Sequence, residues 1–185
     1  TAPAVPTVER APSAVFVNRE GDRFLFDCGE GTQRGMIRFG TGFGVDRIFV
    51  SHLHGDHVLG IPGLVQTLGF NDRTEPLRIH CPPNAGDALR GLVRAAGHEP
   101  AFPVRVDPVA PGDVAVDADG YEVRAFETEH RTESQGYVLE EDDRPGRFDR
   151  PAAEELGVPV GPKFGRLHDG EPVEAADGSV VEPDQ

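Results

Sequence analysis

The sequence predicts an α/β protein in which short strands alternate with helices. Apolar segments of strand length at 45–51 and 77–81 are each followed by apolar residues at helical spacing, at 57–68 and 82–97. The first of these junctions contains three histidines and one aspartate within six residues, which packing does not readily explain. A chain of 185 residues is long enough for one domain with a hydrophobic core.

The remaining elements follow from the same patterns. The expected strands span residues 14–18, 22–27, 45–51, 77–81, 104–106, 121–126 and 136–139. The expected helices span residues 30–39, 57–68, 82–97 and 151–156. The first two strands should form a hairpin, and 108–120 should be a turn-rich link. Apolar side chains expected to pack against the core include Met36, Ile37, Phe39 and Leu59.

The charge balance is strongly acidic, with a net charge of −14 and one lysine among 18 basic residues. This argues against a generally basic nucleic-acid-binding surface and favours adaptation to high salt. No apolar stretch reaches the ~20 residues of a membrane-spanning helix. Two cysteines, Cys28 and Cys81, suit a reducing interior, and we therefore expect a cytoplasmic protein without a membrane partner.

The junction after the strand at 45–51 reads His52-Leu53-His54-Gly55-Asp56-His57. Imidazole and carboxylate groups are the usual ligands of zinc and similar ions. His52 and His54 are two residues apart, so at a strand end they point the same way and can share one metal. Asp56 and His57 follow the bend at Gly55 and can face a second metal. The alternative is a helix capped by Asp56 with incidental histidines.

These residues resemble the HxHxDH signature of the metallo-β-lactamase superfamily, whose fold is an αββα sandwich. A narrower resemblance, to the ribonuclease Z family of tRNA 3′-processing endonucleases, comes from other stretches. These are Phe26-Asp27-Cys28-Gly29-Glu30-Gly31-Thr32-Gln33, Gly60-Ile61-Pro62-Gly63, His130 with the following Ser134-Gln135-Gly136-Tyr137, and the glycine–proline segment at 157–170. The resemblance implies mainly the amino-terminal half of the sandwich at 1–145, and a flexible arm at 146–185.

The resemblance also implies the roles of individual residues. His130 would be the third imidazole on the first metal, beside His52 and His54, although alone it would be read as a surface histidine. Asp56 would be both a ligand and the acceptor of the proton from the attacking water. The expected cofactors are two Zn²⁺ ions, with Mn²⁺ possible. Asp27 could hold a histidine ligand in place or simply cap the next helix, and the sequence does not decide between these.

The segment 157–170 resembles the exosite loop with which this family grips precursor tRNA. Prolines would stiffen a projecting loop, Lys163 and Arg166 would supply cations, and Phe164 a stacking face. The candidate RNA-binding residues are Gly161, Pro162, Lys163, Phe164 and Arg166. The alternative is a linker to a following domain. The resemblance further implies a homodimer.

In the family, a bridging carboxylate and a last histidine ligand come after the arm, and a first strand precedes the opening loop. We therefore expect a chain shortened at both ends relative to the family. Two other functions remain open. One is another hydrolase of the same fold, acting on small phosphodiesters, thioesters or lactones. The other is a tRNA-binding fragment without catalysis.

Overall fold

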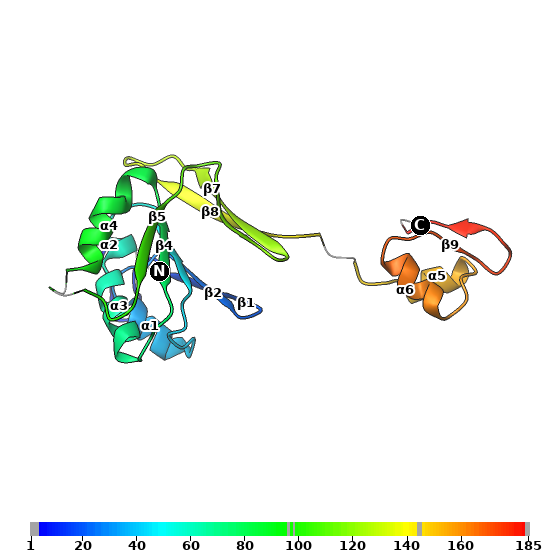
Figure 1. Ribbon diagram of the computed structural model, residues 1–185, viewed down its shortest axis with the longest axis horizontal. Coiled ribbons are helices and arrows are strands. Elements are labelled where there is room, and N and C mark those ends of the chain that lie inside the picture. The colour runs from blue at the N-terminus through cyan, green and yellow to red at the C-terminus, as the bar shows by residue number, and fades with distance from the viewer. Residues whose placement is uncertain (1–3, 96, 98, 144–145, 184–185) are drawn as a thin grey trace. The chain divides into compact units, whose positions relative to one another are not determined.

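The computed structural model describes residues 4–95, 97, 99–143 and 146–183. The chain divides into two compact units, Thr1–Glu141 and Asp142–Gln185 (Figure 1). Each unit has its own hydrophobic core.

The first unit contains two sheets and several helices. Its strands are β1 Val15–Arg19, β2 Asp22–Phe26, β3 Arg47–Phe49, β4 Leu77–Cys81, β5 Val104–Pro108, β6 Val114–Ala118, β7 Tyr121–Glu127 and β8 Gln135–Glu141. Its helices are α1 Thr32–Phe39, α2 Gly55–Val58, α3 Ile61–Phe70, the 3₁₀ turn η1 Pro83–Ala85 and α4 Gly86–Val93.

Five strands form the first sheet, in the order β1-β2-β3-β4-β5. The β1–β2 pair is the expected antiparallel hairpin, closed by Glu20 and Gly21, which both have positive φ. Two-residue hairpin turns favour such residues because their twist matches that of the strands. The pairs from β2 to β5 are parallel, so the carboxyl ends of these strands share one edge of the sheet.

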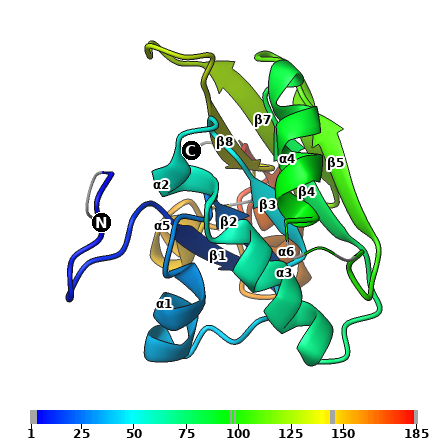
Figure 2. The same ribbon diagram turned by 90° about the vertical axis from the view of Figure 1, so that its left-hand side faces the viewer.

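The helices α1, α3 and α4 cover one face of this sheet (Figure 1 and Figure 2). Alternation along β4 explains why: Leu77, Ile79 and Cys81 are buried toward the helices, whereas Arg78 and His80 point to the opposite face. That opposite face packs Phe24 and Phe49 against Val116 and Val123 of the second sheet, which has the order β6-β7-β8. The unit is thus a helix–sheet–sheet sandwich, in agreement with the predicted fold class.

Three details of the sequence-based assignment are wrong in this unit. Ile37 and Phe39 are 69% and 77% exposed, because α1 is short and among its apolar side chains only Met36 reaches the core. The helix expected at 57–68 is broken into α2 and α3, and Leu59 at the break is 56% exposed. The link expected at 108–120 contains the strand β6, whose mixture of small, apolar and acidic residues does not predict a strand.

The second unit consists of α5 Arg150–Glu155, α6 Pro162–His168 and the short hairpin β9 Val173–Glu174 with β10 Val180–Val181. Its core contains Ala153, Val158, Leu167, Val173 and Val181. The projecting loop expected at 157–170 is therefore wrong over the half of this segment that forms α6. Pro162 occupies the first turn of α6, where its missing N–H costs nothing, and Leu167 anchors the helix to the core.

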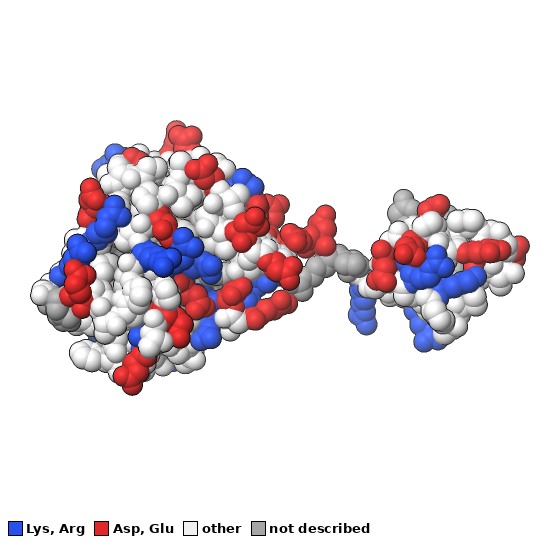
Figure 3. Space-filling model, viewed as in Figure 1, with Lys and Arg blue, Asp and Glu red and all other residues white. Residues whose placement is uncertain are grey.

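The visible surface of both units carries many acidic side chains, interspersed with arginines (Figure 3). Among the residues that the structure describes, no helix is both long and apolar enough to cross a membrane. Cys28 and Cys81 are both buried free thiols.

Candidate metal centre

The predicted ligands gather where β2 and β3 end. Asp27 directly follows β2, and the segment from Ser51 to His57 follows β3 and extends into α2. Because β2 and β3 are parallel neighbours, both segments leave the sheet at the same edge. His130 comes from the connection between β7 and β8 of the second sheet.

The structure brings His52, His54 and His130 together. One ring nitrogen from each lies within 4.8 Å of the others, the only such group of at least three His, Cys, Asp or Glu residues within the described ranges. The Nδ1 atom of His54 is 3.3 Å from the Nε2 atom of His130. Two nitrogens bound to one tetrahedral zinc ion at ~2.0–2.1 Å lie roughly 3.4 Å apart. The donor set and its spacing therefore fit a metal ion.

His52 is suited to a ligand role because it favours the neutral form. Burial, which is the largest cause, and the neighbouring imidazoles of His57, His54 and His130 together lower its pKa from 6.5 to about 4, against an opposing effect of Asp27. A neutral imidazole keeps the lone pair that a metal requires.

Asp56 and His57 lie beside this cluster and outside it. The Oδ2 atom of Asp56 is 3.5 Å from Nε2 of His57, and the His57 ring centre is 4.1 Å from that of His52. Burial alone would raise the pKa of Asp56, but the hydrogen bond that it accepts from the Ala4 N–H and the nearby histidines lower it overall. Asp56 is therefore a carboxylate at neutral pH.

Asp27 is the centre of the hydrogen-bond network behind the histidines. Its Oδ2 accepts from Nδ1 of His57 at 2.6 Å and from the Ser51 hydroxyl at 3.0 Å, and its Oδ1 accepts from the Ser51 N–H at 2.8 Å. Its φ of 58° is in the left-handed region, which aspartate tolerates better than most residues. The bond to His57 leaves Nε2 of that ring free to bind a metal.

Two glycines let the loops after β2 and β3 pack tightly enough for this contact. A Cβ on Gly60 would overlap the carbonyl oxygen of Gly29, and a Cβ on Gly29 would overlap that of Asp56. The backbone then joins the loops directly, since the Cys28 N–H donates to the His57 carbonyl at 2.7 Å.

The five arm residues predicted to contact RNA lie in the second unit, at the start of α6 and along it. Lys163 donates to the Glu174 carbonyl, and Arg166 pairs with Glu171 at 2.8 Å. Phe164 is half-buried, with its ring centre 5.1 Å from that of Phe148. Its ring therefore packs inside the unit, unlike the free stacking face expected from the sequence.

Two participants in the site are not among the predicted site residues. The sequence places Ser51 only in the strand expected at 45–51, although its position directly before His52 is a usable signal. The Ala4 N–H, which donates to Asp56 at 3.0 Å, gave no signal because any residue has a backbone amide.

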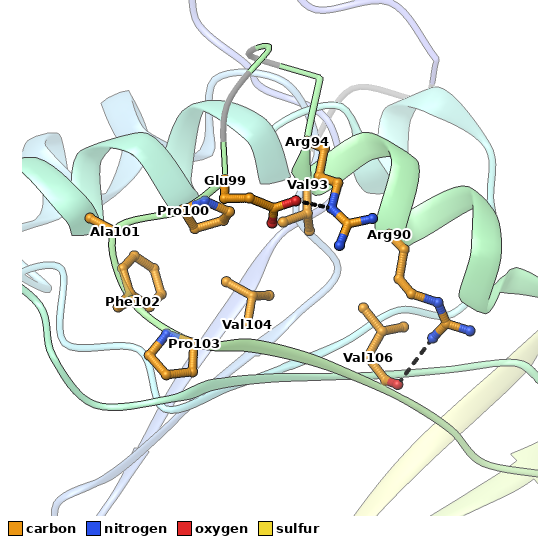
Figure 4. A pocket seen from close by; sticks show the side chains of 10 residues that line it. All are labelled: Arg90, Val93, Arg94, Glu99, Pro100, Ala101, Phe102, Pro103, Val104 and Val106. Atoms are coloured by element: carbon orange, nitrogen blue, oxygen red, sulfur yellow. Dashed lines mark hydrogen bonds and ion pairs between the residues drawn. The ribbon is translucent and has the colours of Figure 1, made fainter.

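A cavity of about 500 Å³ lies apart from these histidines, between α4 and β5 (Figure 4). Its lining includes the ion pair of Arg94 with Glu99 and the apolar side chains of Val93, Phe102 and Val104. None of the predicted ligands lines it, so the candidate site is assigned from its chemistry rather than from the size of a cavity.

The family model of the metallo-beta-lactamase superfamily matches residues 7–147. Proteins named ribonuclease Z from Halorubrum lacusprofundi and Haloferax volcanii are 82% and 67% identical over the whole chain, which covers 60% and 58% of them. The crystal structure of the short form of human tRNase Z aligns with a TM-score of 0.68 and 30% identity, over 76% of this chain and 62% of that one. The chain thus spans about 60% of the length of the curated relatives it matches.

Proposed function

The chain belongs to the metallo-beta-lactamase superfamily, and from this premise we propose that it is part of a metal-dependent endoribonuclease of the ribonuclease Z type. The reaction is removal of the 3′ trailer from precursor tRNA, which leaves a 3′-hydroxyl on the tRNA. The observation that carries the proposal is the alignment of the whole chain, at 82% identity, with a protein named ribonuclease Z. The cluster of His52, His54 and His130 supplies the matching chemistry.

The cofactors proposed are two Zn²⁺ ions, with Mn²⁺ as an alternative. His52, His54 and His130 would hold the first, and Asp56 and His57 would contribute to the second. When bound, such a pair activates a water and stabilises the attacking and leaving oxygens of a phosphodiester. The 3.3 Å between the ring nitrogens of His54 and His130 supports the first site, and Nε2 of His57 beside the Asp56 carboxylate supports the second.

The chain's own residues would move one proton. The carboxylate of Asp56, kept ionised by its lowered pKa, accepts a proton from the attacking water. The water oxygen then bonds to phosphorus, and the bond from phosphorus to the tRNA 3′ oxygen breaks. That oxygen takes up a proton from solvent and becomes the 3′-hydroxyl, the phosphate stays on the released trailer, and Asp56 returns its proton to solvent. Asp27 holds His57 in one orientation throughout.

The substrate would be gripped by residues 146–185, which form the arm of a two-part chain whose core spans 1–145. Lys163 and Arg166 are the cations proposed to reach phosphates, with Gly161, Pro162 and Phe164 shaping the turn and helix that carry them. We further propose a homodimer acting in the cytoplasm, and the two free buried thiols are consistent with that compartment.

The test is cleavage of a 3′-extended precursor tRNA with Zn²⁺ or Mn²⁺ by the intact protein, beside Asp56→Ala. Loss of a ligand and a proton acceptor should abolish cleavage while tRNA binding persists. The matched control is Asp119→Ala, since Asp119 is exposed in the turn between β6 and β7 and has no hydrogen bond or ion pair among the described residues. Equal cleavage by Asp56→Ala and the parent would refute the role of Asp56, and no cleavage by the parent would refute the activity.

A further inference from the structure

The Ser51 hydroxyl occupies a position between three groups of the metal centre. Its Oγ lies 3.0 Å from Oδ2 of Asp27, 2.9 Å from Nδ1 of His52 and 3.3 Å from Nδ1 of His57. Asp27 forms a direct hydrogen bond with Nδ1 of His57 but not with Nδ1 of His52. The serine is thus the group that stands between the carboxylate and the buried histidine.

The backbone fixes Ser51 in this position from two sides. Its N–H donates to Oδ1 of Asp27 at 2.8 Å, and its carbonyl accepts from the Gln135 N–H at 3.0 Å. With both backbone groups held, the short side chain has few positions available. The hydroxyl is therefore aimed by the fold and does not depend on the histidines for its placement.

Counting protons gives the direction of each hydrogen bond. A carboxylate can only accept, so Asp27 takes one proton from His57 Nδ1 and one from the Ser51 hydroxyl. A serine hydroxyl carries a single proton, which is then used. Its oxygen lone pair is left to accept from Nδ1 of His52, so that ring must carry its proton on Nδ1. The lone pair of His52 is then on Nε2, the nitrogen left for a metal.

We propose that Ser51 is a positioning residue that relays the orienting hydrogen bond of Asp27 to His52. One buried carboxylate then fixes the tautomers of two histidines, His57 directly and His52 through the serine. These histidines belong to the two different metal positions of the proposed function, on which this inference rests. Both metal positions depend on Asp27, so a substitution of Asp27 alters both of them, whereas a substitution of Ser51 alters chiefly the position of His52.

The alternative arrangement reverses one bond. If the Ser51 hydroxyl donated to Nδ1 of His52, that ring would carry its proton on Nε2 and could not offer this nitrogen to a metal. Oδ2 of Asp27 would also lose a donor at 3.0 Å. Orienting partners of this kind typically change metal affinity by 10–100-fold when they are removed.

The experiment compares Ser51→Ala and Ser51→Thr with the parent, using the intact protein. The first readout is the tautomer of His52 in the metal-free state, from imidazole ¹⁵N chemical shifts. The second is the affinity for Zn²⁺, from competition with a chromophoric chelator. Ser51→Ala should give a mixture of His52 tautomers and lose about 10–100-fold in affinity. Ser51→Thr keeps a hydroxyl at the same carbon and should show the parental His52 tautomer and the parental Zn²⁺ affinity.

The matched control is Ser13→Ala. The Ser13 hydroxyl also lies near Oδ2 of Asp27, at 3.5 Å, but has no histidine contact among the described residues. It should leave the His52 tautomer and the Zn²⁺ affinity at parental values. A parental tautomer in Ser51→Ala, or an equal loss in Ser13→Ala, would overturn the relay. Because the tautomer is read without metal or RNA, a failure of tRNA cleavage would not be mistaken for a failure of this inference.

Discussion

His80 gives the sharpest prediction about stability, because it is a buried histidine whose ring makes no hydrogen bond to the residues that the structure describes. It lies on β4 between the two sheets, is 1% exposed, and stacks on Phe49 with ring centres 4.9 Å apart. Neither ring nitrogen has a hydrogen-bond partner within the part of the chain that the structure describes. Burial lowers its pKa from 6.5 to about 4, against an opposing effect of Asp107 and with smaller lowering by Arg78 and Arg47.

The size and sign of the effect follow from this pKa. Between pH 6.5 and about pH 4 the unfolded chain binds a proton at His80 that the folded chain excludes, so stability falls as the pH falls through this window. The full difference of about 2.5 pH units, at about 1.36 kcal/mol per unit, amounts to about 3 kcal/mol. By pH 5 roughly 2 kcal/mol of it should already be lost.

The variant that tests this is His80→Phe, which keeps a ring against Phe49 and cannot titrate. Overpacking by the larger ring can cost about 1–3 kcal/mol, but this cost is the same at every pH. Urea unfolding of the metal-free protein at pH 7.5 and at pH 5 gives the free energy of unfolding at each pH. The decrease between the two pH values should be about 2 kcal/mol smaller in the variant than in the parent. His168→Phe, at an exposed histidine, should keep the parental loss. Equal losses in His80→Phe and the parent would refute the reasoning.

Two further predictions concern the metal centre and the arm. Asparagine at position 27 tolerates the same left-handed backbone, but in Asp27→Asn one acceptor oxygen becomes a donor that faces His57 or Ser51. Urea unfolding of the metal-free protein should therefore show a free energy of unfolding lower by about 1.5–3 kcal/mol. A parental free energy of unfolding would contradict the network. The double variant Lys163→Ala with Arg166→Ala should bind precursor tRNA more weakly in a filter assay, with an unchanged far-UV circular dichroism spectrum. The control is Arg150→Ala, which removes a side chain that pairs with Glu154 and should bind tRNA as the parent does. Equal binding by the parent, the double variant and the control would show that Lys163 and Arg166 do not contact the RNA.

Much of the fold was predictable because its signals are local. The β1–β2 hairpin is encoded by apolar strands around a two-residue turn, and β4 by the alternation from Leu77 to Cys81. The grouping of His52 and His54 was equally local. What the sequence did not predict depends on distant contacts. The break between α2 and α3 at Gly60 exists because the loop after β2 passes there, and the burial of Leu167 depends on a small core formed by several separate segments of the second unit.

The contact between His54 and His130 shows why geometry could not be derived from spacing alone. The two rings are 76 residues apart in the chain, and no periodicity connects them. They meet because the Gln135 N–H donates to the Ser51 carbonyl, which joins the start of β8 to the segment that follows β3. This contact places the loop between β7 and β8 beside the histidines of that segment. The metal centre thus depends on the packing of one sheet on the other, so a change at the sheet interface can alter the site without touching any ligand.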